Sequence, residues 1–344
     1  MGSQKNTTNN MNEFLKLSDK DRANILTQTS IRKKLSLRAI EKDWWVTMTL
    51  RTLFECQCFN HIVFKGGTSL SKAWNLIERF SEDIDIAIDR KFFGFDGELK
   101  KRQINNLRRA SCSYIKDELQ HELNQKLREN GIVGFTSFVP EAEATTKDPQ
   151  IIEIHYNSLF APDYVQNKVV IEIGARSLVE PSKNVQLRSI IADFYPNADY
   201  ADDYFSVPTV IPQRTFLEKA FLLHEEFQKP PEKIRAERMT RHIYDLEKIM
   251  DTNYAADALK NIDLYNVIVQ HRKTLTALKE VDYSTHVPEK INFVPPAFIM
   301  DTWRKDYEAM QSGMIYGKSL PFGELIERIK ELNERFRQIK PRFP

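Results

Sequence analysis

Two aspartates separated by a single residue carry the clearest chemical signal in the sequence. Asp83 and Asp85 alternate with isoleucines in the segment Asp83-Ile-Asp-Ile-Ala-Ile88. In a β-strand both aspartates point to one face, about 6.6 Å apart along the chain, while the isoleucines anchor the opposite face in a core. Carboxylates held this close repel each other, and a hard cation such as Mg²⁺, which also binds triphosphate oxygens, offsets that repulsion. The alternative is an edge strand that carries two solvent-exposed acids. The Asp-x-Asp tripeptide is common, so on its own it favours this alternative.

A glycine pair precedes the aspartates, in the segment Phe64-Lys-Gly-Gly-Thr-Ser-Leu-Ser71. Gly66 and Gly67 follow a short apolar run and precede a helical pattern, so the backbone can approach a ligand closely there. Thr68 and Ser69 add hydroxyl and N–H groups near the positive end of the expected helix, an arrangement that suits a phosphate. Alone, the segment is typical of a tight strand-to-helix turn. Followed by the two aspartates, it favours a binding site.

A third carboxylate fits the same site. Glu172 is a lone acid in the apolar run Val169-Val-Ile-Glu-Ile173, and burying an unpaired acid is costly. It therefore either faces solvent on an edge strand or joins a metal site. Glu153, in Ile151-Ile-Glu-Ile154, is its main rival. We prefer Glu172 because Gly174-Ala-Arg176 follows it in a longer recognisable string.

The hydrophobic periodicity predicts the elements that must position these residues. It indicates helices over about 39–55 and 99–129, a helix after Gly67 that runs through Ile77, and strands over 61–64, 83–88, 151–156 and 168–173. A loop is expected at Pro208, and the pattern is helical almost throughout after Pro212. We therefore expect an α/β domain over 11–208 and a helical domain over 209–344, after a tail or cloning remnant at 1–10.

The composition bounds the function only broadly. The net charge of +2 over 344 residues excludes a strongly basic nucleic-acid-binding body, and no apolar run is long enough for a transmembrane helix. Three cysteines, an odd count in a long chain, argue against a disulfide framework and favour a reducing cytoplasm. Local basic clusters at 32–38 and 100–109 are either tracks for phosphates or solvated helix faces.

A glycine pair followed by Thr-Ser, then Asp-Ile-Asp and an isolated acid in a later strand, resembles the polymerase-β-like nucleotidyltransferase superfamily. The sequence resembles the AbiEii/AbiGii toxin family more specifically, over residues from about 40 to 335. The matching strings are Glu41-Lys-Asp-Trp-Trp45, Lys65-Gly-Gly-Thr-Ser-Leu70, Arg79-Phe-Ser-Glu-Asp-Ile-Asp85, Ile171-Glu-Ile-Gly-Ala-Arg-Ser177, Phe216-Leu-Glu-Lys219, Arg241-His-Ile-Tyr-Asp-Leu246 and Asp306-Tyr-Glu-Ala-Met310.

The resemblance implies an α/β (α+β) fold with a nucleotidyltransferase-like mixed sheet and a helical C-terminal domain. It also implies Mg²⁺-dependent transfer of NMP from an NTP to an acceptor hydroxyl, with Mn²⁺ as an alternative metal. Asp83, Asp85 and Glu172 would hold the metal. For some relatives the acceptor is the 3′ end of tRNA. The partner would be a separately encoded antitoxin that neutralises the toxin of an abortive-infection or toxin–antitoxin pair.

Further site residues follow from the same resemblance. Lys219 would lie near the nucleotide phosphates, whereas its sequence context alone favours a lysine that snorkels out of an apolar helix. Asp245 would orient Lys219 or activate the acceptor hydroxyl, or it could pair with Arg241 one helical turn away. Ser81 would lie at the nucleotide site. His242 occupies a position where many relatives carry Asp, and we assign it no catalytic role.

Two other functions are open at this point. One is a nucleotidyltransferase of the same fold that modifies a small molecule such as an aminoglycoside. The other is a non-catalytic nucleotide-binding scaffold, against which the intact pair Asp83 and Asp85 argues. The sequence names neither the base of the NTP nor the acceptor.

Overall fold

The structure is a computed structural model that describes residues 10–141, 148–161 and 165–339. The chain divides into two compact units. The first contains the chain up to Phe64, Glu82–Val179 and Lys183–Thr209; the second contains Lys65–Ser81, Glu180–Ser182 and the chain from Val210 onward. The units differ from the predicted domains, 11–208 and 209–344, because the segments 65–81 and 180–182 belong with the later part of the chain.

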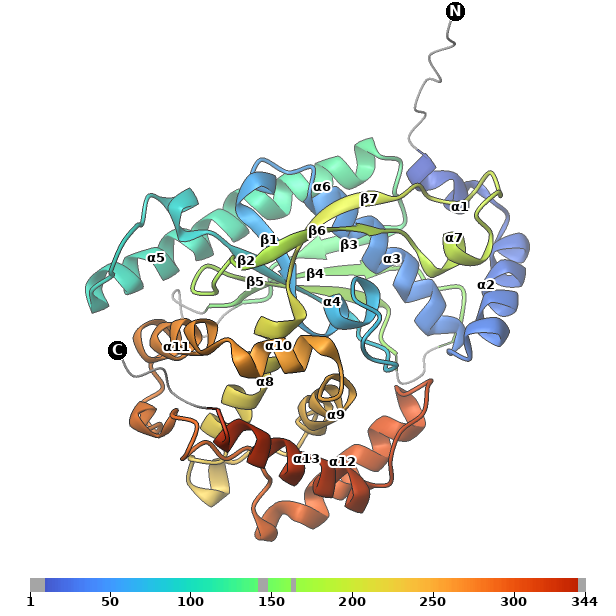
Figure 1. Ribbon diagram of the computed structural model, residues 1–344. Coiled ribbons are helices and arrows are strands. Elements are labelled where there is room, and N and C mark those ends of the chain that lie inside the picture. Colours follow the sequence, from blue (N-terminus) through green and yellow to red (C-terminus); the bar gives the residue numbers. More distant parts are fainter. Residues whose placement is uncertain (1–9, 142–147, 162–164, 340–344) are drawn as a thin grey trace, which may run out of the picture. The chain divides into compact units, whose positions relative to one another are not determined.

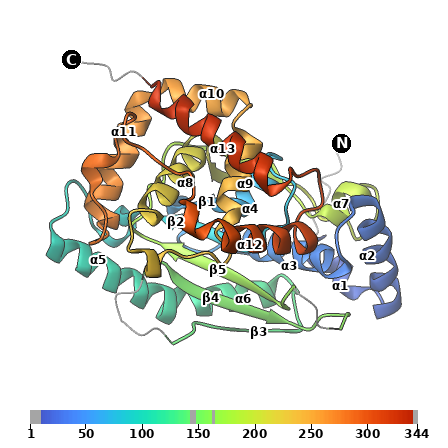
Figure 2. The same cartoon turned by 90° about the horizontal axis from the view of Figure 1, so that it is seen from below.

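A seven-stranded mixed sheet has the order β3-β4-β5-β2-β1-β7-β6 (Figure 1). The strands are β1 (Ile62–Lys65), β2 (Asp83–Ile88), β3 (Phe135–Phe138), β4 (Gln150–Tyr156), β5 (Lys168–Gly174), β6 (Ser182–Leu187) and β7 (Phe205–Val210). β2 pairs with β5, and β1 with β7, in parallel. β4 is antiparallel to both β3 and β5, and Figure 2 shows these three strands side by side.

The helices of the first unit begin at sequence signals that cap them. The side chains of Ser18 and Ser36 accept hydrogen bonds from backbone N–H groups in the first turns of α2 and α3. The helices are α1 (Glu13–Lys16), α2 (Asp19–Lys33), α3 (Leu37–Leu53), α5 (Lys101–Tyr114), α6 (Gln120–Glu129) and α7 (Ile190–Phe194). A π-helical segment, Ile115–Leu119, joins α5 to α6. The helical prediction over 99–129 is therefore confirmed.

The core of the first unit lies against one face of the sheet. Ile84 and Ile86 of β2 are fully buried, as are Ile171 and Ile173 of β5. α3 packs on both of these strands, and its side chains are buried almost throughout its length. Because side chains alternate along a strand, this core fixes the opposite face of β2 and β5 as the face that carries the acidic residues.

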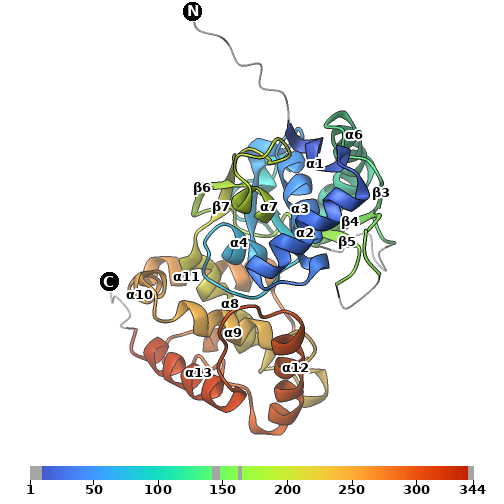
Figure 3. The same cartoon turned by 90° about the vertical axis from the view of Figure 1, so that its right-hand side faces the viewer.

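The second unit is helical. Its helices are α4 (Gly66–Lys72), α8 (Pro212–Glu226), α9 (Thr240–Ile249), α10 (Asn253–Lys260), α11 (Ile262–His271), α12 (Met300–Gly313) and α13 (Phe322–Arg337), with a π-helical segment at Arg272–Thr276. α9 contacts α8, α12 and α13 (Figure 3). Short 3₁₀ helices occur in the two units at Asn10–Asn12, Phe59–His61, Arg90–Phe93, Pro231–Lys233, Tyr283–Thr285 and Ala297–Ile299. No helix among the described residues is long and apolar enough to cross a membrane.

Two expectations about secondary structure were wrong, and two strands were missed. The helix after Gly67 ends at Lys72 rather than running through Ile77, because Asn75 adopts a left-handed conformation with φ of +50°. The expected loop at Pro208 is part of β7, where the neighbouring Thr209 still pairs with Phe64. The strands β3 and β6 were missed because both are edge strands in which polar, exposed residues weaken the apolar pattern.

Candidate active site

The register of β2 and β5 brings acidic residues together on one face of the sheet. Asp85 is the direct partner of Glu172, and Asp83 is the partner of Val170. Partners on parallel strands point to the same side, and residues two apart on one strand share a face. Asp83, Asp85 and Glu172 therefore all lie on the face opposite the isoleucine core, and all three are partly exposed.

The rival carboxylate lies further from the aspartates. Glu153 is on β4, on the far side of β5 from β2, where it is the partner of Val170. Its two oxygens contact Lys168 Nζ at 2.7 Å and His155 Nε2 at 2.6 Å. Burial acts to raise the pKa of Glu153, but the hydrogen bonds from Lys168 and His155 outweigh burial, and the pKa lies below its usual value. Glu153 is thus already neutralised within the protein, and the register favours Glu172.

The chemistry of the three carboxylates fits a divalent cation. Hard oxygen ligands on one face of two adjacent strands are what Mg²⁺ takes, with substrate oxygens completing its shell. Over residues 10–141, 148–161 and 165–339, no group of three or more His, Cys, Asp or Glu side chains is already arranged around a common metal position. The backbone register therefore supplies suitable ligands, and rotation of side chains would have to bring their oxygens together.

The glycine turn belongs to the second unit and is shaped by its neighbours. Gly66 has φ of +77°, a conformation that favours glycine. A Cβ atom on Gly67 would lie 2.6 Å from Nη2 of Arg79 and 2.9 Å from Oγ of Ser81. The hydroxyl of Thr68 donates to that same Ser81 oxygen at 2.9 Å. Both glycines are therefore required by the conformation and packing of the turn itself.

The side chain of Ser69, which the sequence assigned to nucleotide binding, is turned inward. Ser69 is fully buried, and its Oγ donates to the carbonyl of Gly66 at 2.8 Å. The residues of the turn that the sequence singled out, including Ser81, thus come together in the second unit. Any contact of this turn with a phosphate would depend on its backbone N–H groups more than on the hydroxyl of Ser69.

A buried cluster of charges includes the other two predicted residues. Asp245 is fully buried, and its carboxylate receives two hydrogen bonds of 2.7 Å from Arg79, one from Nε to Oδ1 and one from Nη2 to Oδ2. Lys219 Nζ lies 2.8 Å from the same Oδ2. Lys219 is only 7% exposed, so it does not snorkel to solvent. Asp245 is therefore in contact with both Arg79 and Lys219.

The ionisation of this cluster follows from burial and from the neighbouring charges. Burial lowers the pKa of Lys219, Asp245 opposes that effect, and the positive charge of Arg79 adds to it, so the pKa lies below its usual value. Burial acts to raise the pKa of Asp245, but Arg79 and then Lys219 hold it below its usual value. With all three groups ionised, the cluster carries a net charge of +1, which suits an anionic ligand.

His242 lies beside this cluster as a neutral group. Its Nδ1 is 3.5 Å from Lys219 Nζ, and burial, followed by the charge of Lys219 and that of Arg241, holds its pKa well below the usual value. A neutral imidazole can accept a hydrogen bond from the ammonium at Nδ1. His242 is therefore uncharged near neutral pH.

Two contributors to the site were missed from the sequence. Arg79 belongs to a string that we quoted for the family resemblance, but no role was assigned to it. Lys42, only 1% exposed, forms an ion pair of 2.7 Å with Glu82, the residue immediately before Asp83. Lys219 stands in a largely apolar helical stretch, 215–223, which was the available signal there, whereas Lys42 is flanked by Glu41 and Asp43 and gave no such signal.

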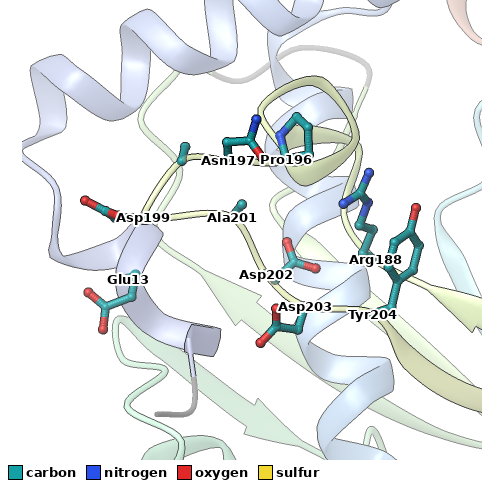
Figure 4. Close-up of a pocket in the computed structure, with 10 residues that line it drawn as sticks. Glu13, Arg188, Pro196, Asn197, Asp199, Ala201, Asp202, Asp203 and Tyr204 are labelled. Carbon is teal, nitrogen blue, oxygen red and sulfur yellow. The ribbon is translucent and has the colours of Figure 1, made fainter. Parts of the chain in front are cut away.

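A pocket of about 480 Å³ lies elsewhere in the first unit (Figure 4). Its wall consists of Glu13, Arg188 and residues of the 196–204 loop, and none of the predicted site residues line it. The guanidinium of Arg188 lies 4.3 Å from the ring centre of Tyr204 and pairs with Asp193 at 2.6 Å. The carboxylate of Asp202 accepts hydrogen bonds from the N–H and hydroxyl of Ser189. These polar groups are partnered within the protein, and we assign the pocket no role in the chemistry.

Comparison with known proteins identifies the family. Residues 49–339 match the family described as "Nucleotidyl transferase AbiEii toxin, Type IV TA system". No curated protein sequence matches the chain significantly. Among solved structures, the nucleotidyltransferase toxin MenT4 of Mycobacterium tuberculosis H37Rv has a TM-score of 0.56 at 15% identity, over 94% of this chain and 91% of its own. JHP933 of Helicobacter pylori has a TM-score of 0.44 at 12% identity, over 88% and 94% of the two chains.

The likeness to MenT4 confirms the predicted fold, a mixed sheet flanked by helices with a helical C-terminal region. The family match covers most of the chain, including every residue predicted for the site. The match confirms the predicted family and the predicted enzyme class. It argues against the alternative of a non-catalytic scaffold protein. The chain belongs to the AbiEii family of nucleotidyltransferase toxins of type IV toxin–antitoxin systems.

Proposed function

We propose that the chain transfers an NMP group from an NTP to the 3′-terminal hydroxyl of an RNA, with tRNA as the acceptor. The observation that carries the nucleotidyl-transfer half of this proposal is the register of Asp85 with Glu172, with Asp83 on the same face. The choice of an RNA acceptor rests on what the resemblance to the family implies. Small molecules are the competing acceptors, and the experiment below separates the two.

Asp83, Asp85 and Glu172 are the residues that would hold a divalent metal, Mg²⁺ or Mn²⁺. When bound, such a metal polarises the α-phosphate, favours the ionised acceptor hydroxyl and neutralises charge on the departing pyrophosphate. The protein contributes a fixed strand register, which is anchored by the buried isoleucines of β2 and β5. The pairing of Lys42 with Glu82 holds the start of β2 from the side of α3.

Lys219 and the Gly66–Gly67 turn are the residues that would contact the triphosphate. The ammonium of Lys219 is held in place by Asp245, and it is a compact charge of the kind that binds phosphate. The backbone of the Gly66–Gly67 turn can approach a phosphate closely because neither residue carries a side chain. Asp245 has both oxygens engaged by Arg79 and Lys219, so we assign it orientation of Lys219 and not activation of the acceptor hydroxyl.

Family membership also bears on partners. In a toxin–antitoxin system the antitoxin counters the effect of the toxin. We therefore expect a separately encoded antitoxin to neutralise this chain in the cell. Co-expression provides the test, because growth arrest caused by the chain alone should be relieved by the antitoxin. The same arrest should disappear in the Asp85→Asn variant without any antitoxin.

The acceptor experiment uses the purified chain with each α-labelled NTP, Mg²⁺ or Mn²⁺, and either total tRNA or an aminoglycoside panel. Label should appear on tRNA with the unmodified 3′ end and should be absent from tRNA whose terminal diol has been oxidised with periodate. Asp85→Asn is the inactive control. Transfer to a small molecule with unlabelled RNA would refute the RNA acceptor, and labelling of oxidised RNA would refute the 3′ end as the site.

A further inference from the structure

Arg79 lies at the centre of a short chain of contacts that crosses the second unit. Its Nη2 atom donates to Oδ2 of Asp245 at 2.7 Å, and the same oxygen lies 2.8 Å from Lys219 Nζ. The same Nη2 atom occupies the space that a side chain on Gly67 would need, because a Cβ there would lie 2.6 Å away. One guanidinium nitrogen thus touches the glycine turn on one side and the carboxylate that holds Lys219 on the other.

The backbone of Arg79 is fixed as firmly as its side chain. Arg79 forms an isolated antiparallel bridge with Ile315, and the flanking residues Phe80 and Glu78 bond to the backbone of Met314 and Tyr316 at 2.7 and 3.0 Å. The side chain is 3% exposed. A guanidinium with a fixed backbone and a bidentate partner has little freedom, so displacement at one end must be passed to the other.

We infer that Arg79 is a positioning residue that sets the place of the Lys219 ammonium relative to the Gly66–Gly67 turn. In this view position 67 must be glycine chiefly because the guanidinium of Arg79 fills the adjacent space, with Oγ of Ser81 as the next nearest atom. This differs from the usual reason for such a glycine, which is close approach of the backbone to a phosphate. The inference rests on the proposed function, in which Lys219 and the turn both contact the triphosphate.

The two explanations of Gly67 predict different results in a double-mutant cycle. Gly67→Ala should push the guanidinium away, and Arg79→Lys should remove Nη2 while keeping the positive charge. Each single change should lower kcat/KM for the NTP about ten- to a hundredfold, the range expected for a weakened charge-assisted contact. Gly67→Ala in the Arg79→Lys background should cost less than it does in the wild-type background, because only Oγ of Ser81, 2.9 Å from the new Cβ, then still has to move. If the loss of kcat/KM in the double variant equals the product of the two single losses, the inference is overturned.

Stability gives a second measurement that does not depend on activity. Gly67→Ala should lower the melting temperature of the otherwise unchanged chain and should lower it less in the Arg79→Lys background, where only the contact with Ser81 remains. Equal losses in both backgrounds would contradict the contact between Arg79 and Gly67. If the wild-type chain transferred no NMP from any NTP, the proposed function would fail. The melting-temperature cycle and NTP affinities from calorimetry would still decide the inference about Arg79.

A matched control separates positioning from general loss of stability. Arg272 forms a comparable buried pair with Glu225 in the same unit, with Nε to Oε1 at 2.6 Å, and none of the predicted site residues takes part in it. Arg272→Lys should lower the melting temperature about as much as Arg79→Lys while leaving kcat/KM unchanged. An equal loss of activity in Arg272→Lys would show that the loss in Arg79→Lys is structural and would overturn the inference.

The pH dependence of NTP binding supplies a signature that a purely structural role would not move. The charge of Arg79 acts to lower the pKa of Lys219. Arg79→Gln removes that charge, so the alkaline limb of the KM profile for NTP should move to higher pH. If Arg79→Gln raised KM for NTP at every pH but left the alkaline limb at the same pH, the result would contradict an effect of Arg79 on Lys219.

Discussion

Asp85 and Glu172 are register partners on the neighbouring parallel strands β2 and β5. Neighbouring strands lie about 4.8 Å apart, so two carboxylates of like charge stand side by side on the partly exposed face of the sheet. Asp83 adds a third acid on the same face, one alternation earlier along β2. In an arrangement of this kind a bound cation offsets the repulsion between the carboxylates.

Replacing Asp85 by Asn should therefore abolish transfer without damaging the fold. We expect a loss of kcat of about a thousandfold or more, since loss of a metal ligand removes several kcal/mol of charge stabilisation in the transition state. The melting temperature should stay the same or rise slightly, because the repulsion from Glu172 is removed. Steady-state transfer assays and calorimetric melting measure the two effects.

Glu153→Gln is the control for this change. Glu153 lies on the same side of the sheet but is paired with Lys168 and His155. Its replacement should leave transfer within a few-fold of the wild-type rate and should reduce stability modestly. If Glu153→Gln were inactive and Glu172→Gln active, the third carboxylate would be Glu153 and our preference would be wrong.

Metal and NTP should bind cooperatively. The phosphates supply part of the coordination shell of Mg²⁺, so each ligand should raise the affinity of the other by the same factor. Titration calorimetry of a non-hydrolysable NTP analogue should give clearly weaker binding in EDTA than in Mg²⁺ for the wild-type chain and no such difference for Asp85→Asn. An NTP affinity unaffected by EDTA in the wild-type chain would remove the metal from the proposal.

The sequence was informative wherever a signal was local. The alternation of Asp83 and Asp85 with isoleucines predicted both the strand and the face that carries the acids, and β2 confirms them. The pairing of β2 with β5 joins segments more than eighty residues apart, so its register could not be read from either segment alone. The choice of Glu172 over Glu153 therefore rested on the resemblance to the family, and only the register supplied a geometric reason for it.

The charge cluster shows the same limit more sharply. For Asp245 the sequence offered Arg241 as a local partner at one helical turn, whereas the structure pairs it with Arg79, 166 residues away, and with Lys219. Propensity and periodicity carry no information about which distant charges meet in a buried site. For Lys219 the sequence context favoured a side chain that reaches solvent, whereas the structure shows it buried and paired with Asp245.

The charge of Lys219 can be tested by Lys219→Met, which preserves the aliphatic stem. Because Lys219 is buried and paired, this variant should lose about ten- to a hundredfold in kcat/KM for NTP, equivalent to about 1.5–3 kcal/mol. Stability should change little, since Asp245 retains both hydrogen bonds from Arg79. Lys219→Arg should restore only part of the activity, because a planar guanidinium does not fit the space of an ammonium beside a buried carboxylate.

Asp245→Asn should behave differently from Lys219→Met. It leaves Arg79 and Lys219 beside each other without the carboxylate that they share, so it should destabilise the chain by about 3–5 kcal/mol. Adding Lys219→Met to Asp245→Asn should restore part of that stability, and urea unfolding measures both. Near-wild-type activity of Lys219→Met would remove this lysine from the nucleotide site, whatever the stability data show.

The last prediction concerns His224, a buried histidine of α8 outside the predicted site. The hydroxyl of Thr285 donates to the carbonyl of Asp282, so it accepts from Nε2–H of His224, whose Nδ1 in turn accepts from the N–H of Asn292. The histidine is therefore a neutral imidazole with both nitrogens engaged. Burial, followed by the neighbouring His286, lowers its pKa to about 4.

This shift makes stability depend on pH in a defined window. Above pH 6.5 His224 is neutral in the folded and unfolded states and has no effect on the pH dependence. Between about pH 6.5 and 4 the unfolded chain binds a proton that the folded chain does not, so the free energy of unfolding falls as pH falls, by about 3 kcal/mol in total.

Urea unfolding at pH 7 and pH 4.5 should therefore show a smaller loss of stability in His224→Gln than in the wild-type chain, by about 2–3 kcal/mol. His242 acts in the same direction, since its pKa also lies well below the usual value, but it is present in both proteins and cancels in the difference. An identical pH dependence in the two proteins would mean that His224 is protonated as easily in the folded state as in the unfolded one, against the burial and hydrogen bonding described here.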